Sequence, residues 1–337
     1  MKRILFYSSV NSLELFKTQK FYQIDISILK DLGYDVLLSN RIFDSLLFWK
    51  YDILFSYFYR YSFFAALLAK CFGKKTYFTG GIDSLDSDYA SAFNYKIQAL
   101  FFKLCYWVAD SCIIVSQSDL KNIFKVSSLK KKLSYSEHVI NTKLFIADVP
   151  KEKIFTSIVW MGDEGNVVRK GVDKALQIFA ELKKIPEFVD YRFVIIGRKG
   201  EGEVLVRSII DKYNLKGSVE LKGEVSEEDK INLLKQSKYY FQLSLYEGFG
   251  LAALEALCAN NIIIHSGKGG LANPIYKEQL LFDIDNDFDS ELLKLVNKLA
   301  CFTPITSYDN LLEYYDIQRR KDDFEAIIVN GKSNYKS

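Results

Sequence analysis

The sequence predicts an α/β protein made of two doubly wound halves, each built on a parallel β-sheet. The chain has 337 residues, enough for two domains of about 150 residues each. Short apolar runs alternate with longer helical patterns, as in βαβ units. The alternation breaks near residues 146–153, beside one of only four prolines. We therefore expect two domains that face a central cleft, where the carboxyl ends of their strands meet.

The first half, residues 1–149, is expected to form one domain. A helix should follow the first strand to about Lys30, and two more should cover the run YSFFAALLAKCFG and residues 94–109. The strand-like runs of this half, bounded by turn residues, are KRILFYS, GYDVLLS, YDILFSY, KKTYFTG, SCIIVS and KLSYSEHVI.

The second half repeats the scheme, with a domain over residues 150–305. Its predicted strands are IFTSIVWMG, YRFVIIG, SVELKG, KYYFQLSL and NIIIHS. Its predicted helices are RKGVDKALQIFAELKK, EVLVRSIIDKYNL, EEDKINLLKQ and one that opens after EGFG. Residues 306–337 should form a last helix, from Tyr308 to Ile328, and a tail that crosses back to the first domain.

Composition excludes several classes of protein. A net charge of +3 is too small to indicate nucleic-acid binding. The five cysteines never form a CxxC pair and there are only two histidines, which disfavours a zinc site or a disulfide framework. No run of about 18 apolar residues indicates a membrane-spanning helix. The amino terminus, MKRILFYSS, is typical of a first strand and not of a signal peptide, so we expect a cytoplasmic protein.

The stretch LYEGFGLAALEALCANN carries the main chemical signal. Glu247 and its glycines lie at a strand-to-helix turn, where backbone N–H groups and the helix dipole can meet an anionic ligand. Glu247 can accept hydrogen bonds from sugar hydroxyls there, or can simply be stabilised by the helix start. Glu255 lies in an apolar helix, where a carboxylate needs a partner. A ligand diol or a salt bridge at a partly exposed position would supply one.

These residues resemble a known family. EGFGLAALEA, with glutamates eight residues apart, is similar to the signature of the GT4 family of retaining glycosyltransferases with the GT-B fold, which has two Rossmann-like domains. RKGVDKALQIF, YRFVIIG and SVELKGEVSEEDKINLL resemble further segments of that family in order and spacing. The resemblance is strong over residues 155–275 and looser before them.

The resemblance implies a role for each matching residue of the second domain. Glu255 would bind the ribose hydroxyls of a nucleotide-sugar donor, Glu247 would hold the transferred sugar, and Lys170 would neutralise the diphosphate leaving group. Glu247 and Lys170 would thus be the catalytic residues. The other donor-binding residues implied are Gly248, Phe249, Gly250, Leu251, Gly162, Arg169, Gly197, Arg198 and Lys222. The implied acceptor-side loop residues of the first domain are Ser9, Asn11, Gly80, Gly81 and Asp83.

Three positions depart from the family pattern. Asp163 lies where an arginine is usual, and it would repel a diphosphate unless Arg169 or Arg198 compensates. Gly80 occupies the place of a histidine. The first strand ends in SSVNS, which lacks the usual glycines and does not make a phosphate nest.

The resemblance implies a metal-independent, retaining hexosyltransferase that needs no cofactor. It would move a sugar from a UDP- or GDP-linked donor to a glycan or lipid-linked acceptor, in bacterial surface polysaccharide synthesis. The aromatic segment from Leu46 to Lys75, with its marginal lysines, can also contact the inner face of a membrane. Two alternatives remain: a nucleotide-sugar epimerase and a non-catalytic nucleotide-sugar-binding subunit.

Three competing motifs favour structural interpretations. Asp86–Asp88 (DSD) matches a metal-binding DxD, but aspartates are common after a glycine turn. Residues 283–289 (DIDNDFD) lack the glycine and glutamate of an EF-hand loop. GRKGEG at 197–202 lacks the GxGxxG spacing of a dinucleotide site.

Overall fold

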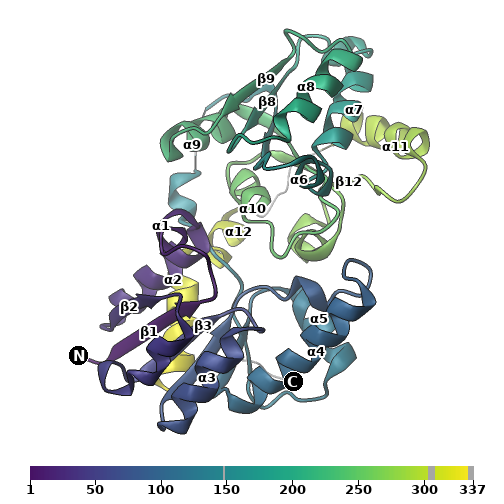
Figure 1. The fold of residues 1–337 in the computed structure, drawn as a ribbon. Coiled ribbons are helices and arrows are strands. Elements are labelled where there is room, and N and C mark those ends of the chain that lie inside the picture. The colour runs from purple at the N-terminus through teal and green to yellow at the C-terminus, as the bar shows by residue number, and fades with distance from the viewer. Residues whose placement is uncertain (147–148, 303–307, 333–337) are drawn as a thin grey trace. The chain divides into compact units, whose positions relative to one another are not determined.

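The structure is a computed structural model that describes residues 1–146, 149–302 and 308–332. It consists of two compact units: residues 1–140 with the described part of 314–337, and residues 141–313. Each unit holds a six-stranded sheet in which every neighbouring pair of strands is parallel. Figure 1 shows helices on both sides of each sheet. The doubly wound α/β fold class predicted from the sequence is confirmed.

The first unit has strand order β2-β1-β3-β4-β5-β6. Its strands are β1 (Arg3–Ser8), β2 (Asp35–Ser39), β3 (Ile53–Tyr57), β4 (Lys75–Thr79), β5 (Ser111–Ile114) and β6 (Leu133–Tyr135). Its helices are α1 (Leu15–Thr18), α2 (Lys20–Asp31), α3 (Ser62–Cys71), α4 (Ala92–Val108), α5 (Gln117–Val126) and α13 (Ile317–Phe324). The short 3-10 helices are η1 (Ile42–Leu46), η2 (Phe48–Lys50) and η3 (Asp83–Leu85).

Alternate residues of each strand in this unit serve two cores. Leu5 and Tyr7 of β1 pack in a core with side chains of α3, α4 and α5. Ile4 and Phe6 pack in another with side chains of α2 and with Phe324 of α13. Since successive strand residues point to opposite faces, the sheet needs apolar residues at both the odd and the even positions of each strand. This explains why its strands are nearly continuous apolar runs.

The second unit has strand order β12-β11-β10-β7-β8-β9. Its strands are β7 (Glu152–Ile158), β8 (Arg192–Ile196), β9 (Val219–Gly223), β10 (Ser237–Gln242), β11 (Ile262–His265) and β12 (Leu280–Leu281). Its helices are α6 (Glu164–Arg169), α7 (Val172–Leu182), α8 (Glu203–Lys212), α9 (Glu227–Gln236), α10 (Leu251–Cys258) and α11 (Phe288–Cys301), with α12 (Tyr308–Tyr314) at the boundary between the units.

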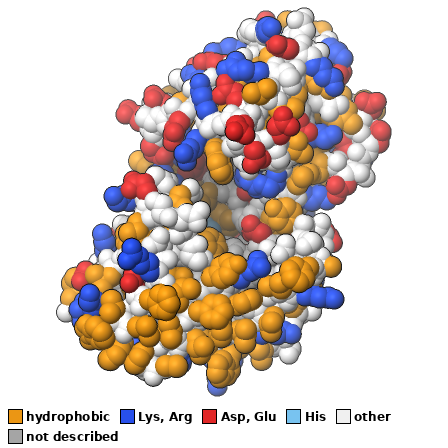
Figure 2. Space-filling view, in the orientation of Figure 1, with side chains coloured by type: hydrophobic (Ala, Val, Ile, Leu, Met, Phe, Trp, Pro, Cys, Tyr) orange, Lys and Arg blue, Asp and Glu red, His pale blue; other side chains and the backbone are white. Residues whose placement is uncertain are grey.

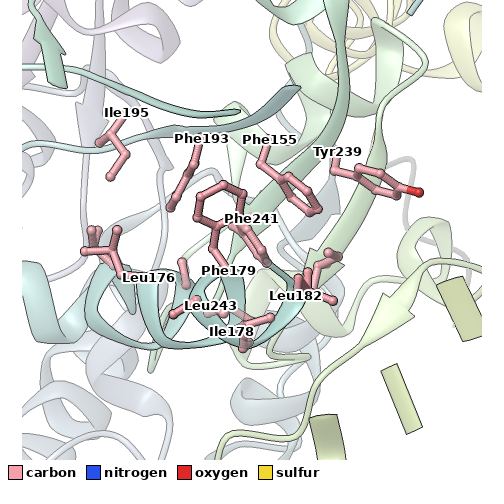
Figure 3. Packing of buried hydrophobic residues seen from close by; sticks show 14 of the residues in the cluster. Phe155, Leu176, Ile178, Phe179, Leu182, Phe193, Ile195, Tyr239, Phe241 and Leu243 are labelled. Atoms are coloured by element: carbon pink, nitrogen blue, oxygen red, sulfur yellow. The ribbon is translucent and has the colours of Figure 1, made fainter. Parts of the chain in front are cut away.

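An aromatic cluster fills the core between the second sheet and α7. Phe155 of β7 stacks on Phe241 of β10, with ring centroids 5.0 Å apart, and meets Phe179 of α7 edge-on at 5.5 Å. Figure 3 shows these rings with Phe193 between the strands and the helix. Each buried ring contributes about 1.5–3 kcal/mol relative to an exposed one, so this cluster fixes α7, and the turn before it, on the sheet.

Several elements were not predicted from the sequence. Helices α5 and α6 and strand β12 were missed, and only a polar loop and helix start was expected at residues 283–289, before the 14-residue α11. Gln19 separates the expected first helix into α1 and α2. The expected last helix is also interrupted, because Asp316 caps α13 by accepting a hydrogen bond from Gln318 N at 3.0 Å. The first unit ends at Ile140 rather than residue 149, and the expected end of the second domain at residue 305 lies outside the described residues.

A buried ion pair ties α13 to the first unit. Arg320 is fully buried, and its guanidinium donates to both carboxylate oxygens of Asp25 on α2, at 2.7 and 2.8 Å. It also donates to the carbonyl oxygens of Ser136 and Glu137, at 2.5 and 3.1 Å. Tyr57 donates its hydroxyl hydrogen to Asp25. The carboxyl-terminal helix is therefore part of the first unit's fold.

Replacing Arg320 with methionine should destabilise the protein by about 3–5 kcal/mol, because Asp25 would remain buried without its cation. Chemical denaturation of Arg320→Met measures this, with the exposed Lys17→Met as the control. The double variant Asp25→Leu with Arg320→Met should be far more stable than the single one. Wild-type stability in Arg320→Met would contradict a structural role for this pair.

Candidate functional site

Sheet topology marks where a ligand can bind in the second unit. The chain adds β8 and β9 on one side of β7 and then returns to place β10 on the other. In a doubly wound sheet this switch opens a crevice at the carboxyl ends of the two strands concerned. Lys170 lies in the turn between α6 and α7, in the connection that follows β7, and Glu247 lies in the loop that follows β10. The two residues named as catalytic from the sequence thus lie on the two connections that border this crevice.

Lys170 and Glu247 form a partly buried ion pair. Lys170 Nζ lies 2.5 Å from Glu247 Oε1, and the exposed fractions of the two side chains are 23% and 12%. Gln242 Nε2 and Ser244 Oγ also donate to Oε1, at 2.8 and 2.7 Å. Among the described residues none donates to the second oxygen, Oε2. The carboxylate is therefore held by one oxygen and can accept hydrogen bonds with the other.

Close backbone contacts fix the two loops on each other. Leu245 N donates to the carbonyl oxygen of Arg169 at 2.8 Å. Gly171 has φ +67°, and a Cβ there would collide with the carbonyl group of Leu243. Glycine at this position therefore permits both the left-handed turn and the close approach, which brings the preceding Lys170 to Glu247.

The turn after Glu247 leads directly into α10. Gly250, with φ +88°, precedes the first helical residue, Leu251, so Gly248–Leu251 lie at a helix start whose N–H groups favour anions. The loop after β11 closes over this turn, because Gly270 N donates to the carbonyl oxygen of Glu247 at 2.6 Å. A Cβ on Gly269 or Gly270 would collide with this turn. This loop was not predicted from the sequence, where its signal was the GKGG run.

Glu255 has a protein partner that the sequence analysis did not name. Lys230 of α9 donates to both oxygens of the buried Glu255 carboxylate, at 2.8 and 2.7 Å, and lies 3.1 Å from Glu227. A diol is therefore not needed to explain a carboxylate in this apolar helix. Instead of a partly exposed salt bridge, the structure has a buried one, with a cation from a neighbouring helix.

Asp163 has a structural role that the sequence did not reveal. Its side chain caps α6 by accepting a hydrogen bond from Asn166 N at 2.7 Å. Arg169, at the end of α6, donates to Asn166 Oδ1 at 2.6 Å, which ties its guanidinium to the same loop. The aspartate in place of an arginine is thus explained by helix capping.

The remaining donor-side candidates divide into two groups. Met161 N donates to Arg198 O at 2.9 Å, which joins the loops after β7 and β8 next to Gly162. Gly197 N donates to Gly223 O at 2.8 Å, which joins the end of β8 to the end of β9. The side chain of Arg198 is exposed. Lys222 on β9 is also largely exposed and lies 3.8 Å from Glu220, so the structure assigns it no contact with the Lys170–Glu247 pair.

The first-unit candidates lie at the ends of two strands that are not neighbours. Ser9 and the exposed Asn11 follow β1, whereas Gly80, Gly81 and the exposed Asp83 follow β4, and β3 lies between these strands. A cavity of about 550 Å³ includes Ser9 but neither Gly80, Gly81 nor Asp83. It is lined by Tyr7, Ser9, Val10, Asn40, Arg41, Ile42, Phe43, Asp44 and Tyr61.

Glycine at position 80 follows from the backbone. Gly80 has φ +101°, and a Cβ there would come within 3.1 Å of the rings of Tyr57 and Phe58. Phe58 itself has φ +67°, an unusual conformation for a bulky residue that concentrates at functional sites. A histidine at position 80 would be strained in this turn. The backbone conformation therefore explains why a glycine lies where the family pattern has a histidine.

The aspartates that suggested metal sites make local structural contacts. Asp86 accepts hydrogen bonds from Asp88 N at 2.9 Å and Asn122 Nδ2 at 3.3 Å. Asp287 caps α11 through Ser290 N at 3.0 Å. Within residues 1–146, 149–302 and 308–332, no group of three or more His, Cys, Asp or Glu side chains is arranged to hold a metal ion, and no helix is long and apolar enough to cross a membrane.

Asp119 is a buried acid that the sequence analysis overlooked. It lies at the start of α5, where its Oδ1 accepts a hydrogen bond from Ile82 N at 3.2 Å, and its Oδ2 has no partner among the described residues. Burial, and then the nearby Asp83, raises the pKa of Asp119 to about 8. The carboxyl group beside the predicted acceptor-side loop is therefore protonated at neutral pH.

Asp119→Asn should remove a pH-dependent loss of stability. The folded pKa lies above the ordinary value of 3.8, so the folded state binds the extra proton, and Asp119 destabilises the fold as pH rises from about 4 to 8. Denaturation between pH 5 and 9 should show the variant gaining stability relative to wild type up to about pH 8. The exposed Asp31→Asn is the control, and parallel pH curves for wild type and Asp119→Asn would contradict the prediction.

Comparisons with known proteins match most of the second unit. Residues 165–299 match the family "Glycosyl transferases group 1". A GDP-mannose:cellobiosyl-diphosphopolyprenol alpha-mannosyltransferase of Xanthomonas oryzae is 32% identical over 42% of this chain and 40% of its own. One subunit of the human phosphatidylinositol N-acetylglucosaminyltransferase is 30% identical over 31% of this chain and 21% of its own. The chain thus spans less than half the length of these curated relatives.

Solved structures match nearly the whole chain. Anabaena HepE in complex with UDP and glucose aligns with a TM-score of 0.74 and 11% identity, over 98% of this chain and all of that one. Sucrose-phosphate synthase from Thermosynechococcus elongatus aligns with a TM-score of 0.65 and 16% identity, over 98% and 97%. The protein therefore has the GT-B fold, and its residues 165–299 are similar to the glycosyl transferases group 1 family.

Proposed function

We propose that the protein is a retaining glycosyltransferase of the GT4 type that moves a hexosyl group from a UDP- or GDP-sugar to a glycan or lipid-linked acceptor. The observation that carries the proposal is the Lys170–Glu247 pair at the crevice between β7 and β10, beside the start of α10. The family match over residues 165–299 includes this pair. Such a site offers a cation, N–H donors and a carboxylate within one small region.

The proposed reaction develops negative charge on the departing diphosphate. The bond between the anomeric carbon and the diphosphate oxygen breaks, and that oxygen keeps the electron pair. The acceptor oxygen bonds to the same face of the carbon, and its proton passes to the leaving phosphate. Lys170 and the N–H groups of Gly248–Leu251 stabilise the growing charge, which is the most effective use of fixed donors in a partly buried site.

Glu247 binds the transferred sugar in this proposal. Its Oε1 is already occupied by Lys170, Gln242 and Ser244, which leaves Oε2 to accept hydrogen bonds from sugar hydroxyls. Glu255 binds the ribose and shares Lys230 when it does so. No step is assigned to a metal or a cofactor, and we propose that the transferase needs neither.

The relatives' names support the choice of donor and acceptor classes. The Xanthomonas relative is named for GDP-mannose and a diphosphopolyprenol acceptor, and the human one for phosphatidylinositol, while HepE binds UDP. We propose a lipid-linked acceptor, used at the inner face of a membrane during polysaccharide synthesis. An epimerase is less well supported, because it needs acid–base side chains, and both histidines of the chain, His138 and His265, are buried.

Lys170→Met should reduce the turnover of sugar transfer by about 10²- to 10³-fold, the usual effect of losing one fixed charge-stabilising group. Steady-state kinetics with the matching UDP- or GDP-sugar would measure this. Lys184→Met, which removes an exposed lysine elsewhere in the second unit, should keep wild-type turnover. Nucleotide binding without any transfer in the wild-type protein would favour a non-catalytic binding protein instead.

Glu255→Gln should weaken nucleoside diphosphate binding roughly 10- to 100-fold, because a hydrogen bond to a charged group is lost. Calorimetry with UDP and GDP, with and without magnesium, measures the affinity and tests metal independence. Glu227→Gln is a matched control, since Glu227 also contacts Lys230 but is more exposed. Equal weakening in both variants would indicate that Lys230, and not the Glu255 carboxylate, contacts the nucleotide.

A further inference from the structure

The solvent side of α4 is apolar, although its other side already packs in the core. Phe93, Leu100 and Trp107 recur every seven residues and are 72%, 56% and 68% exposed. Seven residues are close to two helical turns, so these three side chains form one stripe along the helix. Phe102 and Cys105 are fully buried on the opposite side. A helix that is apolar on both sides has a second partner to meet.

The neighbouring helix α3 extends the stripe into a wider surface. Tyr61 and Phe64, at the start of α3, and Phe72, just after its end, are exposed. Phe64 contacts Phe101 of α4, with ring centroids 6.1 Å apart, and Phe72 stacks on Phe48 of η2 at 4.3 Å. Figure 2 shows hydrophobic side chains gathered over this part of the first unit. We call this surface, the outer side of α3 and α4 with η2, the apolar face.

Charges on the apolar face have one sign. Neither α3 nor α4 contains an aspartate or glutamate, whereas Lys70, Lys96 and Lys103 are exposed on them. Lys74 and Lys75 come three and four residues after the end of α3. Lys70 pairs with Asp110 at 2.9 Å, and the remaining lysines give the face a net positive charge. Its partner should therefore be both apolar and anionic.

We propose that the apolar face docks the protein on an anionic lipid bilayer. Exposed aromatic and aliphatic side chains enter the boundary between headgroups and acyl chains, while flanking lysines attract anionic headgroups. Tryptophan and tyrosine side chains favour this depth. The proposal rests on the lipid-linked acceptor proposed above, because docking would bring the first unit to such an acceptor.

A second copy of the chain fits this face less well. A two-fold symmetric interface would press two copies of the same patch together, so that two faces of net positive charge would meet. Like charges held close together in a desolvated interface repel strongly. A lipid surface supplies the opposite charge and needs no shape complementarity.

The test is sedimentation of the full-length protein with vesicles of phosphatidylcholine alone or with about one third phosphatidylglycerol. Wild type should bind the anionic vesicles. Phe93→Ser with Trp107→Ser should lower the partition coefficient by about tenfold or more. Lys96→Gln with Lys103→Gln should lower it about fivefold per charge on anionic vesicles only. The control is Val204→Ser with Leu293→Ser, two residues of the second unit that are 70% and 63% exposed, and it should bind like wild type.

Three outcomes would overturn the proposal. Wild type could fail to bind anionic vesicles, or it could bind them no better than the Phe93/Trp107 variant. Wild type could also be a dimer in solution while this variant is a monomer. Thermal unfolding must show that the variants are folded. The proposed transferase can fail separately, because Lys170→Met should still bind vesicles and the Phe93/Trp107 variant should keep wild-type affinity for nucleoside diphosphate. Vesicle binding without nucleoside diphosphate binding would contradict the proposed transferase but support the docking of the apolar face on lipid.

Discussion

The bond between Lys170 and Glu247 is the interaction on which the arrangement of the second unit's site depends. It joins the α6–α7 turn, in the connection after β7, to the loop after β10. The sheet topology brings these two segments to the same edge but does not fix their side chains relative to each other. Two nearby glycines permit close backbone contacts. A Cβ on Gly171 would collide with the carbonyl group of Leu243, and a Cβ on Gly269 would collide with that of Glu247. A charged pair that is only partly exposed is worth more than a surface pair, because water and salt screen it less.

Both glutamates of the EGFGLAALE stretch are paired with lysines, and this affects what binding must do in the proposed reaction. In the proposed reaction an anionic diphosphate would compete with Glu247 for Lys170, whereas a ribose would add to Glu255 without displacing Lys230. At Lys170 the diphosphate would replace one anionic partner by another. At Glu255 the ribose would add hydrogen bonds to a carboxylate whose charge Lys230 already balances. The two pairs therefore keep the site close to neutral before a donor arrives, which avoids the cost of an isolated buried charge.

The sequence could predict the residues that belong to local patterns but not their partners. Glu247 and Glu255 stand out in a glycine turn and an apolar helix within one short stretch, whereas Lys170 is named through the family resemblance. Lys230 lies 25 residues from Glu255 and Gln242 belongs to the preceding strand, so only tertiary packing shows these contacts. Asp163 shows the same limit: its charge suggested repulsion of a phosphate, but the sequence did not reveal that its side chain caps a six-residue helix. The strands were predictable because both faces of a parallel sheet are buried and need apolar residues.

Two features of the first unit were misleading in the sequence for the same physical reason, namely that burial is a tertiary property. Arg320 lies in the charged run QRRK, which is typical of a solvated helix face, yet it is the fully buried partner of Asp25, 295 residues away. Phe93, Leu100 and Trp107 have the spacing of a core-facing stripe, yet they are exposed. An arginine is tolerated in the core because Asp25 and two carbonyl oxygens satisfy it. No comparable compensation exists for a solvent-exposed apolar stripe in water, so its compensation must come from a partner that it meets.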